Sequence, residues 1–226
     1  MSRDSWRGTL RTRRYSVLLA TLVALVVGSL LSETPTGHSP VFGVLFIVVL
    51  LAGTLTIGVK RRWRWVAGIL AAAAAAVQIL WLFPHSPLDV RWRLGFAAAF
   101  LVFTTVMILK DVLGERLVTG DRISGAVCAY LLIGIVWGLL YAWIRLREPQ
   151  AFSMAGTVEP AVHGEPMIYF SFITLTTLGY GDILPVSHAA RTLALLEAIT
   201  GQVFLVVLVA RLVSLHAGAT PRDSER

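Results

Sequence analysis

Six apolar stretches of spanning or near-spanning length constrain the fold of this chain more than any other feature. They cover residues 15–31, 41–59, 63–83, 92–109, 123–144 and 188–215. About 20 apolar residues in a helix cross the hydrocarbon core of a bilayer, and in lipid the backbone polar groups must be satisfied within the segment. With 56% hydrophobic and 15% charged residues, the chain is predicted to be an all-α membrane protein with six transmembrane helices in a lipid bilayer.

The distribution of basic residues predicts how these helices are oriented. If the N-terminus lies in the cytoplasm, 15 of the 20 Lys and Arg residues fall in inner segments and five in outer ones. Cytoplasmic loops of membrane proteins carry an excess of Lys and Arg. Both termini are therefore expected to be cytoplasmic, and topology rather than nucleic-acid binding explains the net charge of +7. Short loops, arginine-rich ends and alanine content favour a bacterial cell inner membrane.

A shorter apolar segment between the last two stretches has a different architecture. Residues 166–176 start with Pro166, which is favoured at the first position of a helix, and they are too short to cross about 30 Å of hydrocarbon. They are predicted to form a re-entrant helix, which membrane depth allows only where protein or a water-filled cavity surrounds it. The next residues, 176–182, read Thr-Thr-Leu-Gly-Tyr-Gly-Asp. Gly179 and Gly181 permit backbone angles that other residues disfavour, so consecutive carbonyls can face one line. The alternative is an ordinary glycine turn between two membrane helices.

This loop, within the segment from Tyr169 to Pro185, resembles the pore of the potassium channel family, in its bacterial branch with six transmembrane helices and one pore loop. The family's loop reads Thr-Val-Gly-Tyr-Gly, and Leu178 replaces the valine. The resemblance implies a selectivity filter whose backbone carbonyls coordinate K⁺, so the leucine side chain is expected to be tolerated. The residues implied are Thr177, Leu178, Gly179, Tyr180 and Gly181, with K⁺ as the metal at the first four. One loop cannot surround an ion, so three identical subunits are expected as partners in a homotetramer. K⁺ is the permeant ion, and no cofactor is expected.

Three residues are expected to support the filter. The resemblance makes Asp182 an outer anchor that bonds to the pore helix around Tyr169. Glu197 is the one acid within an apolar stretch, and charged groups at membrane depth are costly and usually functional. It is expected to pack behind the filter and to meet hydroxyls of the pore helix; the alternative is a satisfied structural carboxyl. The candidates for those hydroxyls are Ser171, Thr174 and Thr176.

The last apolar stretch is expected to supply the inner cavity and gate. Gly201 lies 20 residues after Gly181, where related pore proteins place a hinge; the alternative is a glycine that permits close helix packing. Gln202, Leu205 and Val209 share a helical face by their spacing. The resemblance implies that this face lines the cavity, with Val213 near the cytoplasmic mouth; the alternative is a face packed on lipid or on neighbouring helices.

The chain is expected to divide near Gly120. Residues 1–120 form a four-helix membrane module, and residues 121–226 form the pore domain, with an outer helix, pore helix, filter and inner helix. A voltage sensor needs charges that move within the membrane, yet residues 94–109 of the fourth stretch carry none. The first module therefore lacks voltage-sensor arginines, and the channel is expected to be voltage-independent.

Passive and selective K⁺ conduction is the function that these features favour. The alternatives are a non-conducting or regulatory membrane subunit and a weakly selective cation channel. The five histidines are scattered over loops and ends, and the sequence contains no metal-binding spacing, nucleophile triad or phosphate-binding glycine loop. The chain is therefore not expected to be an enzyme.

Overall fold

The computed structural model describes residues 14–31, 40–56, 61–81, 89–114, 120–154 and 165–218. The linkers 32–35 and 84–87 lie outside the described residues. So do several of the basic residues on which the orientation prediction depends, among them Arg3, Arg7, Arg222 and Arg226. The prediction that both termini are cytoplasmic therefore concerns parts of the chain that the description does not cover.

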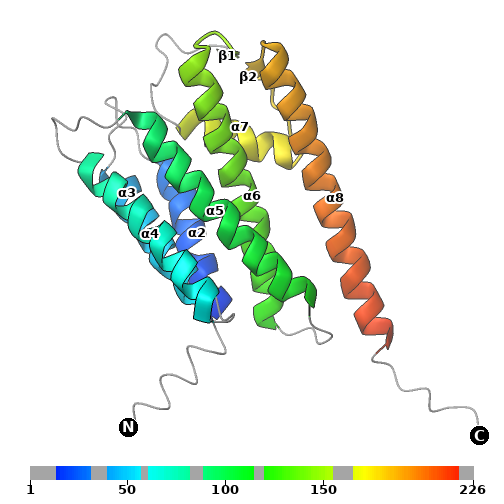
Figure 1. Cartoon of the computed structure of the whole chain (residues 1–226). Coiled ribbons are helices and arrows are strands. Elements are labelled where there is room, and N and C mark those ends of the chain that lie inside the picture. Colours follow the sequence, from blue (N-terminus) through cyan, green and yellow to red (C-terminus); the bar gives the residue numbers. More distant parts are fainter. Residues whose placement is uncertain are drawn as a thin grey trace, which may run out of the picture.

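Six long helices and one short helix make up most of the described chain (Figure 1). Their bounds are α2 Arg14–Leu31, α3 Pro40–Thr56, α4 Arg61–Trp81, α5 Val90–Gly114, α6 Gly120–Arg147, α7 Glu165–Leu175 and α8 His188–Gly218. The start of α2 and the end of α8 lie at one end of the molecule, while α7 and the strands lie toward the other (Figure 1). The short α7 lies between α6 and α8 and packs against both of them.

The chain is a multi-pass membrane protein. Within the described residues, α4, α5, α6 and α8 are long and apolar enough to cross a bilayer, and their candidate spans are 19 to 28 residues long. The apolar parts of α2 and α3, Arg14–Gly28 and Gly43–Thr56, are shorter. At about 1.5 Å per residue, such lengths fall short of the roughly 30 Å of hydrocarbon. Four of the six predicted stretches thus form helices that are long and apolar enough to span a membrane.

Helix α5 runs further than the sequence indicates. The prediction ended this helix before Lys110 and Asp111, but the helix continues to Gly114. Asp111 has partners on α2, because its Oδ2 accepts hydrogen bonds from Arg14 Nη2 and from the Tyr15 hydroxyl, each at 2.5 Å. Asp121 of α6 accepts the Tyr15 amide at 3.1 Å. These contacts join the first described helix to both α5 and α6.

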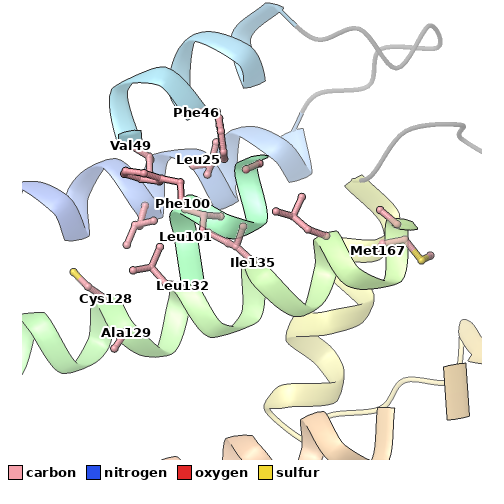
Figure 2. Close-up of a cluster of buried hydrophobic side chains, with 14 of the residues drawn as sticks. Leu25, Phe46, Val49, Phe100, Leu101, Cys128, Ala129, Leu132, Ile135 and Met167 are labelled. Atoms are coloured by element: carbon pink, nitrogen blue, oxygen red, sulfur yellow. The ribbon is translucent and has the colours of Figure 1, made fainter. Parts of the chain in front are cut away.

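One apolar core crosses the expected boundary near Gly120. Leu132 and Ile135 of α6 face Phe100 and Leu101 of α5, and Leu25 of α2 lies in the same cluster (Figure 2). All five are at most 1% exposed. The packing of α2 and α5 on α6 therefore makes the first helices a direct support for the helix that holds α7.

The described part of the chain is predominantly helical, as predicted, and it also contains two short strands that were not predicted. Strand β1, Phe152–Met154, pairs antiparallel with β2, Ile183–Pro185. The Ala151 carbonyl extends the contact by accepting the amides of Val186 and Ser187, at 2.8 and 3.2 Å. Three-residue strands are too short to leave an alternating pattern in a sequence. Their pairing joins the segment after α6 to the segment after residues 176–182.

Candidate functional site

Glycines on two helices let α7 sit unusually close to its neighbours. A Cβ on Gly134 of α6 would lie 2.7 Å from the Phe172 ring, and one on Gly138 would lie 2.9 Å from the Ile168 Cα. A Cβ on Gly201 of α8 would lie 2.3 Å from the Leu175 carbonyl oxygen. Small residues four apart on membrane helices allow this close approach. The Gly134 and Gly138 spacing is thus a signal by which the sequence analysis could have found this contact.

The loop that follows α7 has an alternating backbone. Thr177, Gly179 and Gly181 have φ values of 56°, 54° and 81°, and they are the only described residues with positive φ. Both glycines thus adopt the left-handed angles expected for them, and Thr177 adds a third that the sequence analysis did not anticipate. The amides of Leu178 and Gly179 both bond to the Ile173 carbonyl, at 2.8 and 3.1 Å. Backbones that alternate in hand gather their amides on one side, which leaves the opposite side to carbonyls.

The expected filter residues lie on the surface of the single chain. Leu178 is 56% exposed and Tyr180 is 69% exposed, and Thr177, Gly179 and Gly181 are exposed as well. The side-chain Nε2 of Gln202 on α8 donates to the Thr177 hydroxyl at 3.4 Å. The loop therefore has a protein-covered base at the end of α7 and an open flank.

Glu197 is completely buried at the junction of α6, α7 and α8. Its Oε1 lies 2.5 Å from the Ser171 hydroxyl, and its Oε2 accepts the Tyr141 hydroxyl at 2.6 Å. Ser171 is one of the three hydroxyls expected near Glu197. Tyr141 was not expected, because nothing in the sequence connects a tyrosine of α6 to this acid. The carboxyl thus links α8 to both α6 and α7.

Asp182 and Tyr169 lie together at the other end of α7. The Tyr169 hydroxyl bonds to the Asp182 carboxylate, which is the contact that the family resemblance implied. Asp182 Oδ1 is buried and has no hydrogen-bond partner among the described residues. This carboxylate therefore has one oxygen bonded within its own chain and one buried oxygen without a partner among the described residues.

The residues expected at the inner cavity and gate divide into two groups. Gln202, Leu205, Val209 and Val213 are exposed along α8, whereas Gly201 is buried against α7. The structure therefore gives Gly201 the close-packing role that the sequence analysis kept as an alternative to a hinge. A separate apolar cavity of about 430 Å³ lies between α8 and the α5–α6 pair, and none of these five residues lines it.

A short buried helix, a loop of alternating backbone hand and a long exposed helix follow one another in this part of the chain. Residues 126–216 match the family model described as "Ion channel". This part of the chain is similar to the ion channel family, so the resemblance indicated by the sequence is confirmed for residues 126–216. Because the matching proteins are channels, the prediction that the chain is no enzyme is confirmed as well.

Two curated proteins illustrate the relationship. The chain is 28% identical over 177 residues to the voltage-gated potassium channel Kch of Escherichia coli (strain K12). This alignment covers 76% of this chain and 36% of Kch. It is 46% identical over 46 residues to two-pore potassium channel 4 of Arabidopsis thaliana. This alignment covers 20% of this chain and 16% of the plant protein. The chain therefore spans about a third or less of the length of these relatives. No solved structure matches it.

Proposed function

We propose that this protein is a K⁺-selective channel that conducts passively across the membrane. The observation that carries the proposal is the alternating backbone of Thr177, Gly179 and Gly181 directly after the buried helix α7. With its amides drawn toward Ile173, the loop can present successive carbonyls on its open flank. Carbonyl oxygens in such a row replace the hydration shell of K⁺. The K⁺ sites would be formed at Thr177, Leu178, Gly179 and Tyr180.

The end of α7 adds an electrostatic contribution to this site. The C-terminal end of a helix carries partial negative charge, and α7 ends at Leu175, two residues before the first expected ion site. In the proposed channel α7 is the re-entrant pore helix, held at membrane depth by α6 and α8. Oxygen ligands close to the negative end of a helix dipole suit a hard cation.

A homotetramer would complete the site. One chain leaves the filter residues exposed on one flank, and α8 is widely exposed along its length. Three identical subunits would close the ring of carbonyls and cover part of α8. In this assembly Gln202, Leu205 and Val209 would line the inner cavity, Val213 would lie near the gate, and Asp182, Tyr169 and Glu197 would support the filter.

The proposed setting is a cell inner membrane with both termini in the cytoplasm. The proposed channel has six transmembrane helices, in which α2 and α3 also cross the bilayer. Residues 1–120 form its first module and residues 121–226 form its pore domain. The clustering of basic residues on one side supports this orientation. The uncharged stretch 94–109 supports a channel with little voltage dependence of its own.

Ion flux through purified protein in liposomes tests the proposal. We expect K⁺ and Rb⁺ to pass far better than Na⁺. Equal K⁺ and Na⁺ flux would identify a weakly selective cation channel, and the absence of flux from a folded assembly would identify a non-conducting or regulatory subunit. Gly68→Ala is a matched control for filter glycine variants, because a Cβ at Gly68 of α4 meets nothing within 4 Å.

A further inference from the structure

A continuous row of oxygen atoms connects three helices around Glu197. The Gly134 carbonyl of α6 lies 2.6 Å from the Ser171 hydroxyl of α7, which lies 2.5 Å from Glu197 Oε1 of α8. Glu197 Oε2 lies 2.6 Å from the Tyr141 hydroxyl, back on α6. The three side chains are 0% exposed. The row therefore contains three oxygen–oxygen contacts, each as short as a full O–H···O hydrogen bond.

Each of these contacts needs its own hydrogen atom. The Gly134 carbonyl has none to give, the Ser171 hydroxyl has one, and the Tyr141 hydroxyl has one. An ionised Glu197 only accepts, so two hydrogens would have to serve three contacts. If Ser171 donates to Gly134, then Ser171 has no hydrogen left for Glu197. The third hydrogen must then come from a protonated Glu197, which donates to Ser171 and accepts from Tyr141.

We propose that Glu197 is a proton-binding site and that its bound proton holds α7 against α6 and α8. The ligand is a single proton, and the acceptor is Oε1 of the carboxyl. When the proton leaves, Ser171 must donate to the carboxylate, and its bond to the Gly134 carbonyl is lost. The α7 helix then loses a link to α6 at the level of its seat on Gly134. This inference goes beyond ion conduction and does not require it.

The surroundings of Glu197 do not offer a positive charge to stabilise its ionised form. Among the described residues the two salt bridges are Arg14–Asp111 and Arg91–Asp89, and neither involves Glu197. The titratable groups that face it are Tyr141 and, further away, Tyr130, both on α6. On α7 its contact is the Ser171 hydroxyl, while Tyr169 bonds to Asp182. A buried carboxylate without a cation is costly, which agrees with the hydrogen count.

Infrared spectroscopy of the purified full-length protein tests the protonation directly. Exposed carboxyls have pKa values near 4, so at neutral pH they give no carboxylic-acid carbonyl band. We expect wild-type protein to show such a band at neutral pH and Glu197→Gln to lack it. Glu148→Gln is the control, because Glu148 is an exposed carboxyl at the end of α6. A band missing from wild type, or retained in Glu197→Gln, overturns the proposal.

Stability as a function of pH tests the consequence. The proton is bound more tightly in the folded state, so folding should be most stable at low pH and lose stability as pH rises above about 4. Over the affected window the unfolding constant of wild type should rise about tenfold per pH unit. Gln donates to Ser171 and accepts from Tyr141 as the protonated acid does, so Glu197→Gln should remove this dependence and Glu148→Gln should keep it.

The measurements separate this proposal from the proposed function. Unfolding and infrared spectra are recorded without any ion gradient, so a protein that fails to conduct still gives a decision about Glu197. A Glu197→Gln variant that folds and retains the full pH dependence overturns the proposal. If that variant does not fold, the wild-type carbonyl band at neutral pH and its loss as the pH is raised decide in its place.

Discussion

Gly201→Ala is the most direct test of how α7 is held. The added Cβ would lie 2.3 Å from the Leu175 carbonyl oxygen, which is at least about 1 Å short of an ordinary contact. The obstacle is a backbone atom at the C-terminus of α7, so a rotamer change cannot relieve it. Overpacking of this kind costs about 1–3 kcal/mol, and α7 or α8 must shift by roughly the missing distance.

The loss of stability in Gly201→Ala is measured against a series of Gly→Ala variants at other helical positions. Gly→Ala in a helix gains up to about 1 kcal/mol from propensity alone, so Gly68→Ala, which meets nothing within 4 Å, should be neutral or stabilising. Gly134→Ala meets a Phe172 ring at 2.7 Å, and because a side chain can move, its cost should be intermediate. Gly201→Ala should be about 1–3 kcal/mol less stable than Gly68→Ala, or about 5- to 150-fold in the unfolding constant.

Unfolding of the purified protein and K⁺-over-Na⁺ flux in liposomes are the two readouts. The shift occurs at the base of the expected filter, so selectivity or flux should fall together with stability. A Gly201→Ala protein as stable as Gly68→Ala would refute the close contact between α8 and Leu175. Normal stability with altered opening would instead favour a hinge at this glycine.

Three further outcomes are expected. Gly179→Ala and Gly181→Ala should each cost about 1–2 kcal/mol because their φ values are left-handed, and flux assays should show lost K⁺ preference; unchanged selectivity in both would contradict the proposed backbone geometry. Tail currents recorded over a wide voltage range should show little voltage dependence, because residues 94–109 carry no charge; a steep open-probability curve without added blocker would show that charge moves elsewhere. Asp111→Asn should destabilise the protein by about 1 kcal/mol in unfolding assays, since it weakens the partly exposed contacts to Arg14 and Tyr15; a wild-type unfolding curve would show that these contacts contribute nothing measurable.

Much of the architecture could be predicted because hydrophobic length is a local property. The stretch 188–215 became α8, His188–Gly218, and residues 166–176 became α7, Glu165–Leu175, with a shift of one residue. The positive φ of Gly179 and Gly181 followed from what glycine alone tolerates. These features depend on the residue itself or on its near neighbours in the chain.

The remaining features depend on residues far apart in sequence. Tyr141 bonds to Glu197 across 56 positions, and Tyr15 bonds to Asp111 across 96. Asp111 looked like the polar end of a helix, and only its partners on α2 explain why α5 continues. Strand β1 exists because β2 is there to pair with it. No local pattern specifies such contacts, since they arise when the helices pack.

The arrangement of α8 has a consequence for how the protein is made. One face of α8 is fixed within the chain by α7, at Gly201 and Glu197, whereas other apolar side chains face outward along the whole helix, as Leu195 and Val206 do at 62% and 65% exposure. Biogenesis of the proposed homotetramer should therefore proceed in two stages. Each newly inserted chain can dock α8 on α7 by itself, and the outward face of α8 should be covered only when neighbouring copies assemble.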